Sequence, residues 1–147
     1  MNVPANLPPL GEERPVPAPR VETATLRNGL EVQVVPWDGV PLATARLVLR
    51  GGFSDDAPAE PGLARLLSAA LREGTTARSG AELADLAQEA GGDLLAGAGP
   101  DSLTVAASGL AVRVPALLDL VADTARRPAF PADGVARVKD LVREDLE

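Results

Sequence analysis

The stretch at residues 62–75, GLARLLSAALREGT, constrains the fold most, because it is amphipathic along its whole length and closes on a glycine. Its apolar residues recur at the spacing of one helical face, so we expect a helix that ends at Gly74. The face expected to be core holds Leu63, Leu66, Leu67, Ala70 and Leu71. The opposite face, where any chemistry of this helix has to lie, holds Arg65, Ser68, Ala69 and Arg72.

The segments before this helix predict strands. Asn28 and Gly29 separate two short runs within residues 22–37, which is a strong signal for a β-hairpin. A further strand is expected at residues 43–49, where a Gly-Gly pair ends it. The acidic run at residues 54–60 lacks the ligand spacing of a calcium loop, so it is interpreted as a solvated turn.

The segments after the helix alternate between helix and strand signals. Ser79 is followed three residues later by Glu82, which predicts a capping box at the start of a helix. Two antiparallel strands and two more helices are then expected, at residues 93–98, 102–108, 115–126 and 132–147. The last helix reaches the end of the chain without a cap, which we interpret as the mark of a fragment.

This order of elements predicts an α+β fold, with one antiparallel sheet of about four strands and helices packed on one of its faces. Residues 1–21 are rich in proline and predict an extended N-terminal arm. Residues 22–147 predict one domain that is incomplete at its C-terminus.

The absence of histidine and cysteine restricts the chemistry of the chain. Without these residues it cannot form a Ser-His-Asp triad, a cysteine nucleophile or a zinc site of the usual ligands. A net charge of −7 argues against nucleic acid as a partner. No run approaches the roughly 18 apolar residues of a membrane span. No signal peptide is visible either, and the compartment, cytoplasmic or periplasmic, stays open.

The stretch at residues 62–75 resembles the metal-binding helix of the insulinase/pitrilysin family of zinc peptidases, whose pattern is roughly G-L-A-H-F-L-E-H-M-L-F-K-G-T. Seven residues match without a gap: Gly62, Leu63, Ala64, Leu67, Leu71, Gly74 and Thr75. The rest of the family's order follows after residue 22, in LRNGLEV, LVLRGGFSDD, GGDLLAGAGPDSL and RRPAFP. The resemblance therefore covers nearly the whole chain beyond the arm and implies the N-terminal half-domain of such a peptidase.

The resemblance also implies that the zinc site is lost. The family's His-x-x-Glu-His motif falls on Arg65, Ser68 and Ala69, and its third ligand, a glutamate, falls on Asp145. A guanidinium only donates, a methyl group has no lone pair and a hydroxyl is a poor base. We therefore expect no zinc in this chain and no catalysis by its own residues.

Two functions are compatible with this loss. The first is a zinc-less subunit or domain that shapes the chamber and holds substrate for a catalytic partner, either a homologous subunit or the second half of a longer chain. Zinc is then expected only in that partner. The second is a stand-alone binding or assembly module that keeps the fold without any peptidase partner.

Two groups of residues are candidates for binding. In the resembling enzymes an extended peptide adds itself to a sheet edge, and the matching strand here carries Leu95, Ala96, Gly97 and Ala98 in place of the family's N-A-x-T. The small side chains suit close approach of a second backbone, although glycine can instead serve to bend a strand. Arg65 and Arg72 can grip a carboxylate, although a solvated helix face explains them equally well.

Overall fold

The computed structural model describes residue 11 and residues 18–144. Most of the predicted arm and Asp145 lie outside these residues. The chain forms two compact units, which divide between Val40 and Pro41.

The first unit contains the predicted hairpin. Strands β1 (Glu22–Thr25) and β2 (Glu31–Val34) pair antiparallel around a tight turn. Gly29 has a φ of 83°, and the N–H of Leu26 donates to the carbonyl oxygen of Leu30 at 2.8 Å. Only glycine adopts this left-handed conformation without strain, which is why the Asn-Gly pair predicts the turn correctly.

The second unit is built on a three-stranded antiparallel sheet of order β3-β5-β4. Its strands are β3 (Leu42–Arg50), β4 (Leu94–Ala98) and β5 (Ser102–Leu110). The central β5 aligns Val105 with Leu47 on one side and with Ala96 on the other. The expectation of one sheet of about four strands is wrong, because the hairpin pairs with itself and forms a separate sheet.

The main helices of the second unit are α1 (Leu63–Ala70), α2 (Gly80–Glu89), α3 (Val114–Arg126) and α4 (Ala132–Glu144). Short 3-10 turns lie at Phe53–Asp55, Leu71–Glu73 and Ala111–Arg113. The capping box is confirmed: the N–H of Ser79 donates to Glu82 Oε2 at 2.7 Å, and the N–H of Glu82 donates to Ser79 Oγ at 3.3 Å. This reciprocal pair fixes the start of α2.

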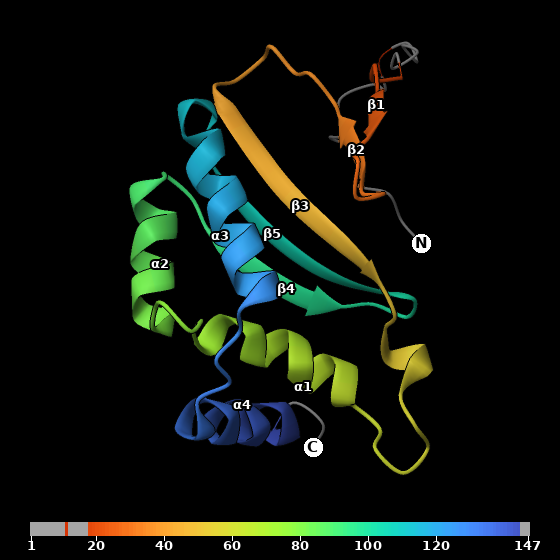
Figure 1. Ribbon diagram of the computed structural model, residues 1–147, viewed down its shortest axis with the longest axis vertical. Coiled ribbons are helices and arrows are strands. Elements are labelled where there is room, and N and C mark those ends of the chain that lie inside the picture. Colours follow the sequence, from red (N-terminus) through yellow and green to blue (C-terminus); the bar gives the residue numbers. More distant parts are fainter. Residues whose placement is uncertain (1–10, 12–17, 145–147) are drawn as a thin grey trace, which may run out of the picture. The chain divides into compact units, whose positions relative to one another are not determined.

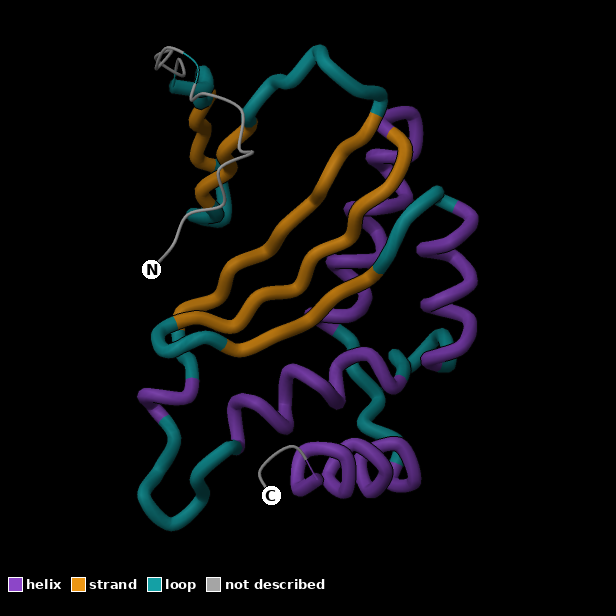
Figure 2. The backbone as a smooth tube through the Cα atoms, turned by 180° about the vertical axis from the view of Figure 1, so that it is seen from behind, coloured by secondary structure: helices purple, strands orange, loops and turns teal. Residues whose placement is uncertain are grey.

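Helices α2 and α3 cover one face of this sheet (Figure 1), whereas no helix of the described residues lies on the opposite face (Figure 2). The covered face buries alternate residues of β5, among them Val105, in one core with Leu83 of α2 and Leu117 of α3. Helix α1 contacts both β4 and α4, and Figure 2 shows it beside β4 at the edge of the sheet. The predicted α+β fold with helices on one face is confirmed. In the part of the chain that is described, no helix is both long and apolar enough to cross a membrane.

Candidate functional site

Helix α1 and the turn after it bury only part of the face that periodicity predicts, because Ala70 and Leu71 lie in the core but two other leucines do not. Leu63 and Leu67 are 49% and 39% exposed, whereas Ala64 and Ser68 are buried. This short helix contacts β4 and β5 as well as α4, and small residues occupy its buried positions. An apolar stripe predicts burial against a single partner surface and cannot reveal this arrangement. The prediction of a core role for Leu63 and Leu67 is therefore wrong for this structure.

The positions that match the zinc motif lie on α1 without metal donors. Ser68 is only 4% exposed, and its hydroxyl donates to the carbonyl oxygen of Arg65 at 2.9 Å. Ala69 is half-buried, and Arg65 is exposed. Within residues 18–144, no group of three acidic side chains lies close enough to hold a metal ion. The fourth position, Asp145, is outside the described residues.

The start of α1 depends on a residue that the sequence interpretation missed. Asp56 accepts hydrogen bonds from the N–H groups of Gly62 and Ala64, at 2.8 and 2.9 Å. Gly62 occupies the N-cap but has no side chain to cap with, so a carboxylate six residues earlier does this work. The acidic run is thus more than a solvated turn. In the sequence, the signal for such a cap is a glycine at the start of a helix together with an aspartate in the loop before it.

The outer edge of β4 presents unpaired backbone groups. At its two ends, Asp93 exchanges hydrogen bonds with Ser108, and the N–H of Gly99 donates to Ser102. Bonded and non-bonded pairs alternate in an antiparallel ladder, so odd-numbered residues of β4 bond to β5. The N–H and C=O groups of Leu94, Ala96 and Ala98 therefore point away from β5. Among the described residues these groups have no backbone partner.

Gly97 lies in the middle of this edge strand, with open space where a side chain would begin. A Cβ at Gly97 has nothing within 4 Å, and its φ is not in the left-handed region. At Gly92, by contrast, a Cβ lies 2.1 Å from the carbonyl oxygen of Ser108, so packing there requires glycine. Neither crowding nor a left-handed φ therefore requires glycine at position 97, and β4 pairs with β5 through this residue without a bulge.

A cavity of about 810 Å³ opens where β4 begins. Arg72, Asp93 and Asp133 are among its lining residues, and none of them forms an ion pair within residues 18–144. The lining of the cavity thus carries both positive and negative side chains. That Arg72 binds a carboxylate of a substrate or partner stays a prediction. The same contact expected of Arg65 also stays a prediction.

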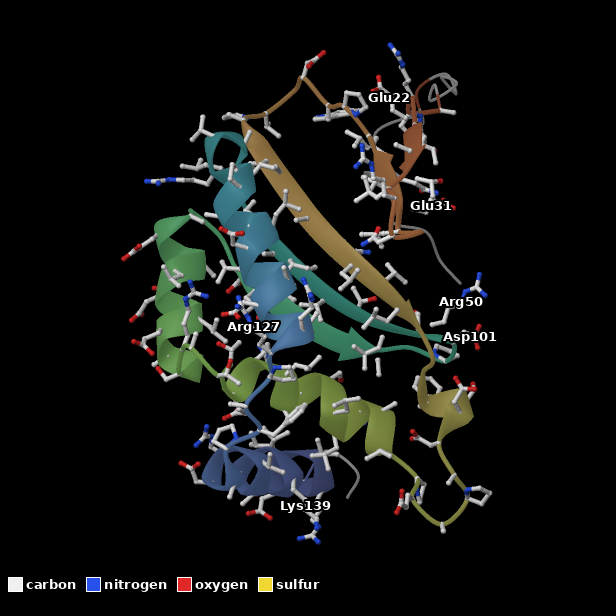
Figure 3. The ribbon with its side chains drawn as sticks, in the orientation of Figure 1. Glu22, Glu31, Arg50, Asp101, Arg127 and Lys139 are labelled. Atoms are coloured by element: carbon white, nitrogen blue, oxygen red, sulfur yellow. The ribbon has the colours of Figure 1, made fainter. Side chains whose placement is uncertain are left out.

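The wall of the cavity is held by a buried carboxylate. Asp123 accepts hydrogen bonds from Thr75 Oγ1 at 3.0 Å, from Arg127 Nε at 2.7 Å and from a guanidinium nitrogen of Arg78. Burial by itself raises the pKa of Asp123, but these three donors outweigh it and hold the pKa below its usual value. Arg127 lies at the C-terminal end of α3 (Figure 3), so this cluster ties that end to the loop after α1.

Residues 37–147 match the family described as Insulinase (Peptidase family M16). The chain belongs to this family. A peptidase M16 inactive domain from Pseudomonas fluorescens is 31% identical, with a TM-score of 0.74 over 82% of this chain and 30% of that one. A protease from Helicobacter pylori is 22% identical, with a TM-score of 0.77 over 87% of this chain and 31% of that one.

Pitrilysin is likewise 22% identical, with a TM-score of 0.75 over 87% of this chain and 14% of its own. No curated protein matches the chain. The M16 fold inferred from residues 62–75 is therefore confirmed, and with it the resemblance to the insulinase/pitrilysin family. The chain spans less than a third of the length of each of these solved structures.

Proposed function

We propose that this chain is a non-catalytic, zinc-less part of an M16 peptidase that holds an extended peptide for a catalytic partner. The observation that carries the proposal is the unpaired outer edge of β4, beside a helix whose metal-ligand positions hold Arg65, Ser68 and Ala69. An exposed strand edge offers main-chain hydrogen bonds to an extended peptide. The same site offers neither a metal donor nor a general base to cleave it.

The partner follows from what the chain lacks. Hydrolysis by the zinc mechanism of this family requires an intact His-x-x-Glu-His motif, which in this proposal comes from a homologous subunit or from the second half of a longer chain. The small share of the solved M16 chains that this chain spans is consistent with such an arrangement. Zinc belongs to that partner in this proposal, and the similar structure described as an inactive M16 domain offers a precedent for a half without activity.

Ala96→Pro tests the docking edge, because proline removes an N–H that points away from the sheet. Thr44→Pro is the matched control. The odd-numbered residues of β5 bond to odd-numbered residues of β3, so the N–H of Thr44 also points outward, at the opposite edge. Gly97→Pro does not serve, because the N–H of Gly97 bonds to β5 and its loss weakens the sheet itself.

The measurement is titration calorimetry with acetylated and amidated ten-residue peptides of alternating threonine and valine, together with melting of each variant. We expect Ala96→Pro to weaken binding of the peptide at least tenfold. The proline disturbs the pairing of the peptide with β4, so that two or three main-chain hydrogen bonds of about 0.5–1.5 kcal/mol each are lost. Thr44→Pro is expected to bind as the wild type does. Unchanged binding by Ala96→Pro, or equal losses in both variants, contradicts the proposal.

A further inference from the structure

Gly97 leaves an opening on the sheet face that carries no helix. In β4 the side chain of Leu95 points to this face and is 56% exposed, and the next position on the same face is Gly97. Thr104 of β5 lies opposite Gly97 and continues the row toward β3. A Cβ at Gly97 meets no atom within 4 Å, so this row ends in empty space at the outer edge of the sheet.

A peptide strand on the outer edge of β4 extends this row by one residue. The residue opposite Gly97 has no side chain to pack against in β4, but it has room to lie over the glycine backbone. A large aromatic side chain uses such room best, because a neighbouring aromatic covers an edge glycine and excludes water from its backbone. Leu95 then supplies an apolar flank one position along the same face.

We propose that Gly97 is a subsite for a large aromatic side chain of the extended peptide, with Leu95 as its flank. This inference rests on the proposed function, because it requires a peptide on the edge of β4. It goes further by naming the class of peptide: one with an aromatic residue at the position opposite Gly97. A small or charged residue there leaves the glycine uncovered and gains no apolar contact.

The test uses three peptides that differ only at the central residue, which is phenylalanine, alanine or lysine in the alternating threonine and valine background. The repeat leaves the register free, so the central residue can settle opposite Gly97. The wild-type chain is expected to bind the phenylalanine peptide about fivefold more tightly than the alanine peptide. Upfield shifts of the Gly97 α-protons should accompany binding of the phenylalanine peptide, because they then lie over the ring.

Gly97→Glu fills the opening with a charge, and Thr44→Glu places the same charge on the same face of β3 as a control. Both positions are exposed, so both variants are expected to fold, which melting curves check. Gly97→Glu should abolish the preference for phenylalanine and favour the lysine peptide, since opposite charges then face each other across the strands. Thr44→Glu should keep the preference for phenylalanine.

The outcomes separate the two proposals. Equal binding of the phenylalanine and alanine peptides by the wild-type chain overturns the subsite and leaves the docking edge intact. A phenylalanine preference that survives in Gly97→Glu also overturns it. If none of the three peptides binds to the wild-type chain, the docking edge is wrong and the subsite falls with it.

Discussion

Two buried threonines differ in whether their hydroxyl groups form hydrogen bonds. Thr75 Oγ1 donates to Asp123 and accepts the N–H of Arg78 at 3.1 Å. Thr124 is fully buried in α3, and its hydroxyl oxygen has no hydrogen-bond partner among the described residues. A buried hydroxyl without a partner loses the hydrogen bonds that water offers it and gains none in return. The same chemical change at the two positions should therefore have effects of opposite sign.

Thr124→Val is expected to raise the free energy of unfolding by about 1 kcal/mol, because it replaces an unsatisfied hydroxyl with a methyl group of the same shape. Thr75→Val, the matched change, should lower the free energy of unfolding by about 1–3 kcal/mol, because it leaves Asp123 without one donor. Urea denaturation at neutral pH measures both. A loss of stability in Thr124→Val would mean that its hydroxyl has a partner.

At the scale of residues, the sequence predicts what can be matched to a motif and misses what depends on distant contacts. The positions of Arg65, Ser68 and Ala69 follow from one gapless stretch. The role of Asp123 does not, because its donor Thr75 lies 48 residues away. No local sequence pattern indicates which aspartate will be buried and hydrogen-bonded by residues that are distant in the sequence.

Elements are predicted well where a cap or turn residue marks their ends. Ser79 and Glu82 place the start of α2, and Gly29 places the hairpin turn, because each acts on backbone groups nearby. The face that a helix buries depends instead on how many elements contact it. For α1, whose neighbours include β4 and α4, the periodicity is wrong about Leu63 and Leu67 but right about Ala70.

This difference predicts unequal effects of one charge at two leucines of the α1 region. Leu67→Asp should cost no more than about 1 kcal/mol in this chain, because the side chain is already 39% exposed. Leu71→Asp should prevent folding, because it buries a charge in the core beside Leu83 and Leu117. Circular dichroism and urea denaturation of the two variants compare them. Complete unfolding of Leu67→Asp would mean that Leu67 is a core residue, as the periodicity of the sequence predicts.

The second unit as a whole is held by one apolar core and one polar cluster. The core lies between the sheet and the helices on its covered face, as an antiparallel sheet with a single helical layer requires. The polar cluster joins α3 to the segment after α1 through Asp123, whose side chain is 1% exposed. The layering was predictable from alternating strands and striped helices. The separation of the hairpin into its own sheet was not, because edge pairing depends on contacts that no local pattern encodes.

Asp123 also predicts how the stability of the second unit responds to acid. Its pKa in the folded chain lies below the value of about 3.9 for an unperturbed aspartate, so the unfolded chain takes up a proton first as the pH falls. The stabilisation by Asp123 is therefore complete above about pH 5 and is lost as the pH falls through the folded-state pKa.

Asp123→Asn should lower the free energy of unfolding by about 2 kcal/mol at pH 7, because charge-assisted hydrogen bonds to two arginines are lost. The difference from the wild type should shrink toward zero between pH 5 and the acid limit of folding, where the carboxylate of the wild type becomes protonated. Asp119→Asn removes the same charge from an exposed position of the same helix and should show no such convergence. Urea denaturation at several pH values follows all three proteins. A gap between Asp123→Asn and the wild type that stays constant into the acid range would mean that the carboxylate of Asp123 contributes through shape alone.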